Sequence, residues 1–291
     1  MKPIHIAFIL LIDCIWAFNT VAIKFSVNAV PPLLAVAIRY GIVLAACLPF
    51  MRWVPGRMRL IGITGVIAGA LAMGLGAMSF KAAYNVSALA IAGQLGVPFS
   101  LLLAIIFYRE RIRWVRMLGI VLSFLGVAVM VFDPRIFDER IAILLTIAGT
   151  FCWAVGTLLF RSLRDLNPLN VHGWLALISI PLLGAASYVE EPGAIMQVGA
   201  IAPNIWGWLA YSALGASVIG HAGMSYLFRH YPVSMVSPMT LPTPLLSVIV
   251  ATVVLGTPVT IEMVIGGILT MIGIAIITLR TANAPEVEVL A

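Results

Sequence analysis

Long apolar runs alternate with short breaks of polar, charged or proline residues along the whole chain. Residues 61–80 and 141–160, for example, contain no charged residue. Because about 20 apolar residues are needed to cross the hydrocarbon core as a helix, the pattern predicts ten membrane-spanning helices. We expect them at residues 4–23, 32–50, 61–80, 86–107, 115–132, 141–160, 170–189, 205–228, 233–254 and 261–279. The chain is therefore expected to be an all-α membrane protein without an inserted soluble domain.

Composition supports this interpretation and excludes two others. The chain has 291 residues, of which 62% are hydrophobic and 10% charged, with a mean hydropathy of +1.11. A soluble domain has roughly half apolar and about a quarter charged residues, so this chain lacks the polar surface of a soluble protein. Its apolar runs also lack the alternation of a transmembrane β-barrel. The net charge of +6 comes from basic residues between the apolar runs, so we expect lipid, and no nucleic acid, around the protein.

The basic residues predict the orientation of the spans. Most of the 17 lysines and arginines fall on one side if the amino terminus is cytoplasmic, as the positive-inside rule requires. Lys24, Lys81, Arg135 and Arg140 fall outside, and Arg39 lies within a span. We therefore expect a multi-pass protein of the inner (plasma) membrane with both termini in the cytoplasm.

No cofactor, metal or catalytic motif is indicated. Cys14, Cys47 and Cys152 lie inside spans as small apolar residues. The sequence contains no Gly-x-Ser-x-Gly, no His-Glu-x-x-His and no phosphate loop. The first apolar run contains Asp13 and lacks a small-residue cleavage site, so we expect a retained helix rather than a secretory signal. The chain is not expected to be an enzyme.

The two halves of the chain carry matching residues. The first and sixth spans correspond through Asp13, Trp16, Thr20 and Lys24 against Thr150, Trp153, Thr157 and Arg161. The entries to the fourth and ninth spans match through Tyr84, Val86 and Ser87 against Tyr231, Val233 and Ser234. The fifth and tenth spans match through Gly119, Ser123 and Gly126 against Gly266, Thr270 and Gly273. We therefore expect a first repeat at 1–135, a second at 136–281 and a cytoplasmic tail at 282–291.

Five spans in each half have a topological consequence. An odd number makes the second copy enter the bilayer in the opposite orientation, so the repeats would be related by a pseudo-two-fold axis in the membrane plane. Inverted repeats are typical of secondary transporters, in which the binding site lies near the midplane between the repeats and rocking alternates access. A duplicated scaffold is also compatible with a channel or a flippase.

The repeated residues resemble those of a known family. Trp16-Ala17 with Asn19 and Lys24, Arg39, Pro98, the Arg109-Glu110-Arg111 turn, Gly119 and their counterparts in the second half are similar to the ten-helix EamA branch of the drug/metabolite transporter superfamily. The resemblance covers residues 6 to 280. It implies export of small metabolites, with amino acids, including aromatic or other hydrophobic ones, as the expected substrates. Other drugs or metabolites, or nucleotide-type solutes, are the alternative. A channel or a membrane enzyme is less favoured.

Asp13 is the candidate for coupling. A carboxylate halfway along a span is costly unless it is neutral, paired or in contact with water. It is therefore expected to exchange protons, which would be the coupling ion, or to bind a substrate amine. The alternative is a structural carboxyl group paired with a nearby helix, for example with Arg39, which is itself a candidate for substrate binding.

The first and sixth spans supply candidates for the wall of a cavity. Trp16 and Trp153 are suited to a flat or apolar substrate, and helix packing is the alternative. Asn19, Thr20 and Thr157 are further candidates on the same helices. Lys24 and Arg161 are expected to extend to the membrane interface.

Prolines predict interruptions at corresponding places in the two halves. Pro98 would free the carbonyl of Gln94, and Pro238, Pro242 and Pro244 would break the ninth span near Thr240 and Thr243. Broken helices at such places point to a binding site, whereas simple kinks are the alternative.

The remaining candidates come from other spans. They are His221, which could titrate or only pack, Ser79, and the outer pair Lys81 and Tyr84, which would form a vestibule or a solvated interface. We expect a small-molecule substrate and a monomer or a homodimer.

Overall fold

The computed structural model describes residues 1–108, 113–131, 138–231 and 233–282, and in these ranges every regular element is a helix. The predicted Arg109-Glu110-Arg111 turn, Arg135 and the tail from residue 283 lie outside the described residues. The described part of the chain is thus all-helical, as the sequence predicts.

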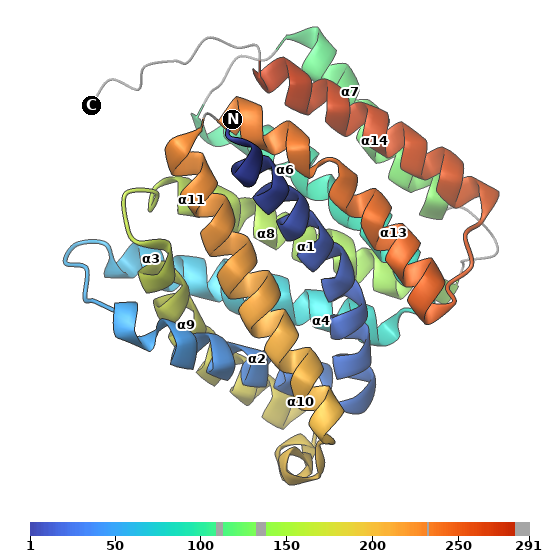
Figure 1. Cartoon of the computed structure of the whole chain (residues 1–291). Helices are drawn as coiled ribbons and strands as arrows, with labels where there is room; N and C mark the ends of the chain where they lie inside the picture. Colours follow the sequence, from blue (N-terminus) through green and yellow to red (C-terminus); the bar gives the residue numbers. More distant parts are fainter. Residues whose placement is uncertain (109–112, 132–137, 232, 283–291) are drawn as a thin grey trace.

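The helices of the first half follow the predicted order (Figure 1). They are α1 (Pro3–Ala29), α2 (Pro32–Cys47), η1 (Leu48–Phe50), α3 (Met58–Thr64), η2 (Gly65–Leu71), α4 (Ala72–Ala82), α5 (Val86–Ala92), η3 (Gly93–Leu95), α6 (Gly96–Tyr108) and α7 (Trp114–Val131). Here η1 and η3 are 3₁₀ turns, whereas η2 is π-helical.

The second half repeats this arrangement. Its helices are α8 (Arg140–Arg161), α9 (Pro168–Glu190), η5 (Ala194–Ala200), α10 (Pro203–Ala210), η6 (Tyr211–His221), α11 (Ala222–His230), α12 (Val233–Val236), η7 (Ser237–Thr240), α13 (Pro242–Leu255) and α14 (Ile261–Ala282). η6 is π-helical and η5 and η7 are 3₁₀. The third and eighth predicted spans thus each contain a π-helical segment, and the fourth and ninth each contain a 3₁₀ segment.

In the described part of the chain, nine helical stretches are long and apolar enough to cross a membrane. They match nine of the ten predicted spans. The eighth predicted span coincides with α10, η6 and α11, which follow one another without a break but are not among the nine. Residues 203–230 are rich in tryptophan, tyrosine, serine and glycine, which lowers their hydropathy. The number of ten crossings therefore stays a prediction.

Helices of the first half pack against helices of the second half. α2 contacts α9, and α7 contacts α14. α1 contacts α10, η6 and α13, and α8 likewise contacts η2, α4 and α6. Figure 1 shows α7 and α14 side by side, and α1 between α11 and α13. The core of the molecule thus lies where the two halves meet.

The α7–α14 contact depends on glycine. A Cβ atom on Gly126 would collide with the backbone oxygen of Gly266, and one on Gly119 would lie 2.8 Å from the backbone oxygen of Gly273. Thr270 Oγ1 also lies 3.4 Å from the carbonyl oxygen of Ser123. The small residues that match between the two halves in sequence therefore face one another in space. Such small residues let transmembrane helices approach closely.

Replacing Gly126 tests this contact. Gly126→Ala is expected to lower the free energy of unfolding by about 1–3 kcal/mol, because the added methyl group meets backbone rather than a side chain that can move. Gly184→Ala in α9 is the matched control, since nothing lies within 4 Å of its added Cβ atom. Unfolding in detergent measures both, and equal stability of the two variants would contradict the packing.

Candidate functional site

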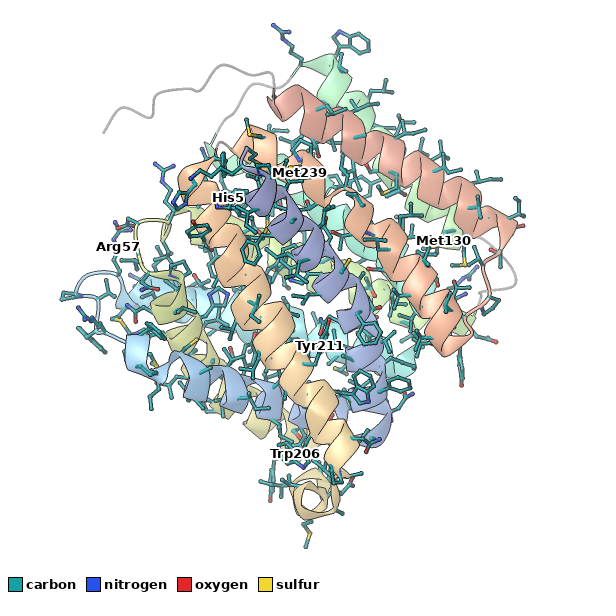
Figure 2. The ribbon with its side chains drawn as sticks, in the orientation of Figure 1. His5, Arg57, Met130, Trp206, Tyr211 and Met239 are labelled. Carbon is teal, nitrogen blue, oxygen red and sulfur yellow. The ribbon has the colours of Figure 1, made fainter. Side chains whose placement is uncertain are left out.

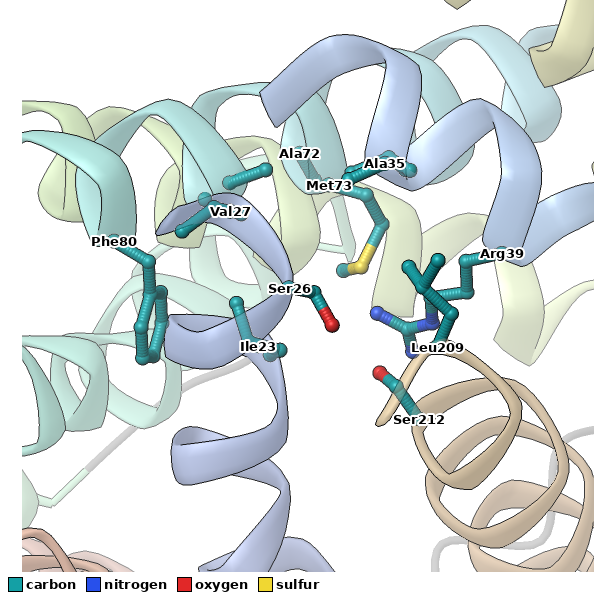
Figure 3. A pocket seen from close by; sticks show the side chains of 13 residues that line it. Ile23, Ser26, Val27, Ala35, Arg39, Ala72, Met73, Phe80, Leu209 and Ser212 are labelled. Atoms are coloured by element: carbon teal, nitrogen blue, oxygen red, sulfur yellow. The ribbon is translucent and has the colours of Figure 1, made fainter. Parts of the chain in front are cut away.

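A cavity of about 170 Å³ lies between α1, α2, α4, α10 and η6 (Figure 3). Its wall is mainly apolar, with Ile23, Met73, Phe80 and Leu209 among the larger side chains. Three polar side chains interrupt this apolar wall, and they are Ser26, Arg39 and Ser212. Figure 3 shows these three directed toward the same space from α1, α2 and η6.

Arg39 brings a positive charge to this cavity. Its Nη2 donates a hydrogen bond of 2.6 Å to Ser217 Oγ, whereas its Nε atom is buried without a hydrogen-bond partner. Among the described residues Arg39 forms no ion pair with a carboxylate. Charged side chains inside a membrane usually pair or face a water-filled pathway, so this unpaired charge is informative.

Two further polar atoms lack partners, one in the cavity wall and one on the helix α1 that forms part of it. Ser212 is 2% exposed, and its Oγ atom has no hydrogen-bond partner. Asn19 Oδ1 is also buried and unpartnered. Asn19 lies one turn before Ile23 and two turns before Ser26, so the three share one face of α1. Because buried polar groups are normally hydrogen-bonded, these atoms indicate a place for a ligand or water.

An aromatic cluster surrounds His221 at the end of η6. The ring centroid of His221 lies 5.5 Å from Trp16, 5.6 Å from Trp153 and 5.6 Å from His172. The ring of Phe160 in turn stacks on the ring of His172, with their centroids 6.0 Å apart. The structure thus brings together three of the predicted residues from α1, α8 and η6. Ser217, which accepts a hydrogen bond from Arg39, lies four residues before His221 in η6, so the cluster adjoins the cavity.

His172 was not predicted, although it is a histidine in an apolar span, as His221 is. Its Nδ1 lies 2.9 Å from the carbonyl oxygen of Pro168, and this contact fixes the ring. The absence of any recognisable motif around it explains why the sequence did not single it out.

Trp16 is fixed by the π-helical segment η6. Its Nε1 donates 3.1 Å to the carbonyl oxygen of Ala216. Nearby, Tyr211, labelled in Figure 2, donates 3.1 Å from its hydroxyl to the carbonyl oxygen of Ile15. Gly220 leaves space for the indole, since a Cβ atom there would collide with Trp16 Nε1. π-Helical turns are uncommon and often occur at functional sites.

Asp13 is bound by a different helix from the one expected. It is fully buried, its Oδ1 accepts a 2.7 Å hydrogen bond from Thr243 Oγ1 of α13, and its Oδ2 has no partner. The carboxyl group thus pairs with a nearby helix, as the structural alternative has it, but Arg39 as its partner is wrong. Two of the predicted site residues, Asp13 and Thr243, do meet, but apart from the residues that line the cavity.

The predicted site residues Thr20 and Thr157, of the first and sixth spans, do not contribute their hydroxyl groups to a shared site. Thr20 Oγ1 donates 2.7 Å to the carbonyl oxygen of Ala17, and Thr157 Oγ1 donates 3.0 Å to that of Trp153. Each hydroxyl is thus bound by its own helix. Thr157 is exposed, so the predicted stripe does not face one common cavity.

Lys24, which was expected to extend to the membrane interface, binds the end of a neighbouring helix. Its Nζ donates to the carbonyl oxygens of Phe80 (2.9 Å) and Ala83 (2.6 Å) at the end of α4. A lysine is favourable there because it binds the free carbonyls and the negative end of the helix dipole. Arg161, for which the same position was expected, lies exposed in the last turn of α8.

Lys81 and Tyr84 lie at the same end of α4. Both are exposed, Tyr84 to 82%. The backbone N–H groups of Tyr84 and Asn85 donate to the buried Glu139 carboxylate at 2.9 and 2.7 Å. Burial raises the pKa of Glu139 above its ordinary value, against the effect of these hydrogen bonds. At this end of the molecule, Glu139 thus binds the backbone N–H groups that follow α4. Neither Lys81 nor Tyr84 lines the cavity.

Ser79 and Gln94 also lie away from the cavity. Ser79 is fully buried and its Oγ donates 2.7 Å to the carbonyl oxygen of Ala142, so it joins α4 to α8. Gln94 lies in η3, directly before α6, which contains Pro98. Both predicted interruptions are present, because η7 likewise contains Pro238 and Thr240 and precedes Pro242 and Pro244 of α13.

Comparison with known proteins gives consistent results. The EamA-like transporter family matches residues 3–132 and 140–279. A "Probable amino-acid metabolite efflux pump" of Salmonella typhimurium is 27% identical over 92% of each chain. An "Uncharacterized transporter" of Archaeoglobus fulgidus is 28% identical over 90% of this chain and 94% of the relative. A "Biotin transporter" of Escherichia coli is 24% identical over 76% of this chain and 75% of the relative.

The fold also has a solved counterpart. A crystal structure superposes with a TM-score of 0.65 at 18% sequence identity, covering 98% of this chain and all of the other. At this identity the likeness concerns the fold alone.

Replacing Gly220 tests the placement of Trp16. Gly220→Ala is expected to reduce the free energy of unfolding by about 1–3 kcal/mol, because the methyl group displaces the indole. Gly215→Ala is the control in the same π-helical segment, since its Cβ atom would make only ordinary contacts, the nearest at 3.6 Å from Ile15. In a Trp16→Ala background, Gly220→Ala should change the free energy of unfolding only slightly, because the indole is no longer present. An equally large loss of stability in that background would contradict this placement of Trp16.

Proposed function

Because the chain belongs to the EamA-like transporter family, we propose that it is a secondary transporter that exports small metabolites by alternating access. Amino acids, including aromatic or other hydrophobic ones, are the proposed substrates, and the inner membrane is the proposed location. Members of this family are transporters, which implies that the chain is not an enzyme.

The observation that carries this proposal is a cavity with unpaired polar groups inside a membrane-embedded helical bundle. Its volume of about 170 Å³ is similar to that of an engineered cavity of roughly 150 Å³ that binds benzene. Pockets that bind drug-sized ligands have volumes of about 300–1,000 Å³. The size thus favours a small metabolite, and the aromatic cluster around His221 favours one with a flat or apolar part.

The contacts between the halves support inverted repeats. Each helix of one half has a counterpart in the other half. When every helix is replaced by its counterpart, the α1–η6 contact becomes the α8–η2 contact, and the α1–α13 contact becomes the α8–α6 contact. The α2–α9 and α7–α14 contacts are unchanged by this exchange. A pseudo-two-fold axis accounts for such a pattern, and we propose that one half rocks against the other about it.

The orientation is part of the proposal. Figure 1 draws the beginning of α1 and the end of α14 toward the same end of the molecule. This supports both termini on one side, and the excess of basic residues favours the cytoplasm. The protein would act as a monomer or a homodimer.

Export of other metabolites is the second candidate. One relative is named a biotin transporter, and biotin is larger than most amino acids. The small volume of the cavity argues against it and against nucleotide-type solutes.

Counterflow in proteoliposomes tests transport. Vesicles loaded with an unlabelled amino acid are expected to accumulate the labelled one faster than empty vesicles, because an exchanger returns to the outer face more rapidly with substrate bound. A panel of leucine, valine, phenylalanine and tryptophan, with biotin as the competing substrate, identifies the class. Uptake that is equally fast in loaded and empty vesicles would indicate a channel instead.

Asp13 is proposed to couple transport to protons. Asp13→Asn keeps the acceptor for Thr243 and removes the titrating group, so substrate binding should persist while acceleration by an imposed pH gradient is lost. Thr243→Val is the companion variant, because it removes the hydrogen bond and keeps the carboxyl group. If Asp13→Asn responds to the gradient as the wild type does, Asp13 is structural.

A further inference from the structure

The positive charge of Arg39 has no counterpart in the cavity. Arg39 is the one charged residue among the described residues that line the cavity, and no ion pair compensates it. Asp13 is bound to Thr243, so it does not supply the missing charge. The neighbouring titratable groups are His221 and Tyr40, and Tyr40 donates its hydroxyl proton to the carbonyl oxygen of Gly69, so neither provides a negative charge. An anion in the cavity would therefore meet an arginine that has no competing anionic partner.

The π-helical segment η6 supplies both serines near Arg39. Ser217 Oγ accepts the hydrogen bond from Arg39 Nη2, and it donates its own proton to the carbonyl oxygen of Ser212 at 3.3 Å. Residues five apart in an α-helix are about 140° apart around the axis. The wider π-helical turn stacks them instead, so one serine orients the guanidinium while the other lines the cavity.

The two π-helical segments differ in this respect. The corresponding segment η2 has the sequence GVIAGAL and contains no hydroxyl group. The fold therefore does not require serines in such a segment.

We propose that Arg39 and Ser212 form a carboxylate-binding subsite, with Ser217 as the positioning residue that directs the guanidinium. The inference rests on the transporter function proposed above and deepens it. A guanidinium binds a carboxylate through two parallel N–H groups, and Arg39 Nε is unpartnered. Ser212 Oγ supplies a further donor. A single cation matches a single negative charge, so the ligand class is a small monocarboxylate, such as an amino acid.

Binding of acids and of their amides tests the subsite. The probes are leucine, valine and phenylalanine, each compared with its amide, and binding is measured from the shift in unfolding temperature of the purified protein. The wild type is expected to bind at least one acid more tightly than its amide. In Arg39→Gln the affinity for the acid should fall by about 10- to 100-fold, and the preference over the amide should disappear.

Further variants separate the subsite from folding. Arg39→Lys keeps the charge and should retain part of the preference. Ser217→Ala leaves the charge but frees the guanidinium, so it should reduce the preference several-fold. Ser212→Ala should do the same and carries the test if Arg39→Gln does not fold. Arg57→Gln is the control, because Arg57 is exposed and paired with Asp165 at 3.7 Å (Figure 2), and it should leave the preference unchanged.

The outcomes distinguish this proposal from the proposed function. If every amide binds the wild type as well as its acid, or if Arg39→Gln keeps the preference, the carboxylate subsite is refuted. If the preference is present but no counterflow occurs with any substrate, the subsite stands and the transport function fails. Counterflow without any acid preference refutes the subsite and leaves transport intact.

Discussion

The structure depends on one constraint, which is that a polar group in the hydrocarbon must find its partner within the protein. Most polar side chains obey it by bonding backbone at helix ends and crossings. Lys24 binds the last carbonyls of α4, and Glu191 accepts from the N–H groups of Leu33 and Leu34 at the start of α2. Buried atoms without a hydrogen-bond partner occur in Asp13 and Glu262, and also in Arg39, Ser212 and Asn19. The last three lie on helices that line one cavity, which is why that cavity is the candidate site.

The same constraint explains why the two halves meet in different ways. α7 and α14 approach through glycines that tolerate no added atom, so this pair is suited to a fixed contact. Elsewhere the third and eighth predicted spans are locally widened to π-helix, and Ser212 in the eighth lines the cavity. Widened turns leave backbone groups to be bound by neighbours, and Tyr40 and Ser179 donate to the carbonyls of Gly69 and Gly65 in this way. The close glycine contact of α7 with α14 and the π-helical segments η2 and η6 thus lie in separate parts of the bundle.

Much of the fold was predictable because periodicity and length dominate in a membrane. Nine expected spans, the proline interruptions and the matched small residues of α7 and α14 all follow from local sequence. The site was less predictable, because helix rotation decides which side chain meets which. Trp16, Trp153 and His221 do cluster, yet Asp13 binds Thr243 instead of Arg39, and Lys24 caps α4. The π-helical turns and His172 have no sequence signal beyond glycine content and an isolated histidine.

The π-helical turn of η6 has a consequence for how such a site changes during evolution. A π-helical turn holds one residue more than an α-helical one, so it can arise from, and be reversed by, the insertion or deletion of a single codon. Deleting one residue between Ser212 and Ser217 would turn one of the two hydroxyl groups away from the site, although both serines would remain in the chain. A family that shares this architecture therefore has a route to new selectivity through changes of helix register, and an alignment restricted to substitutions would miss it.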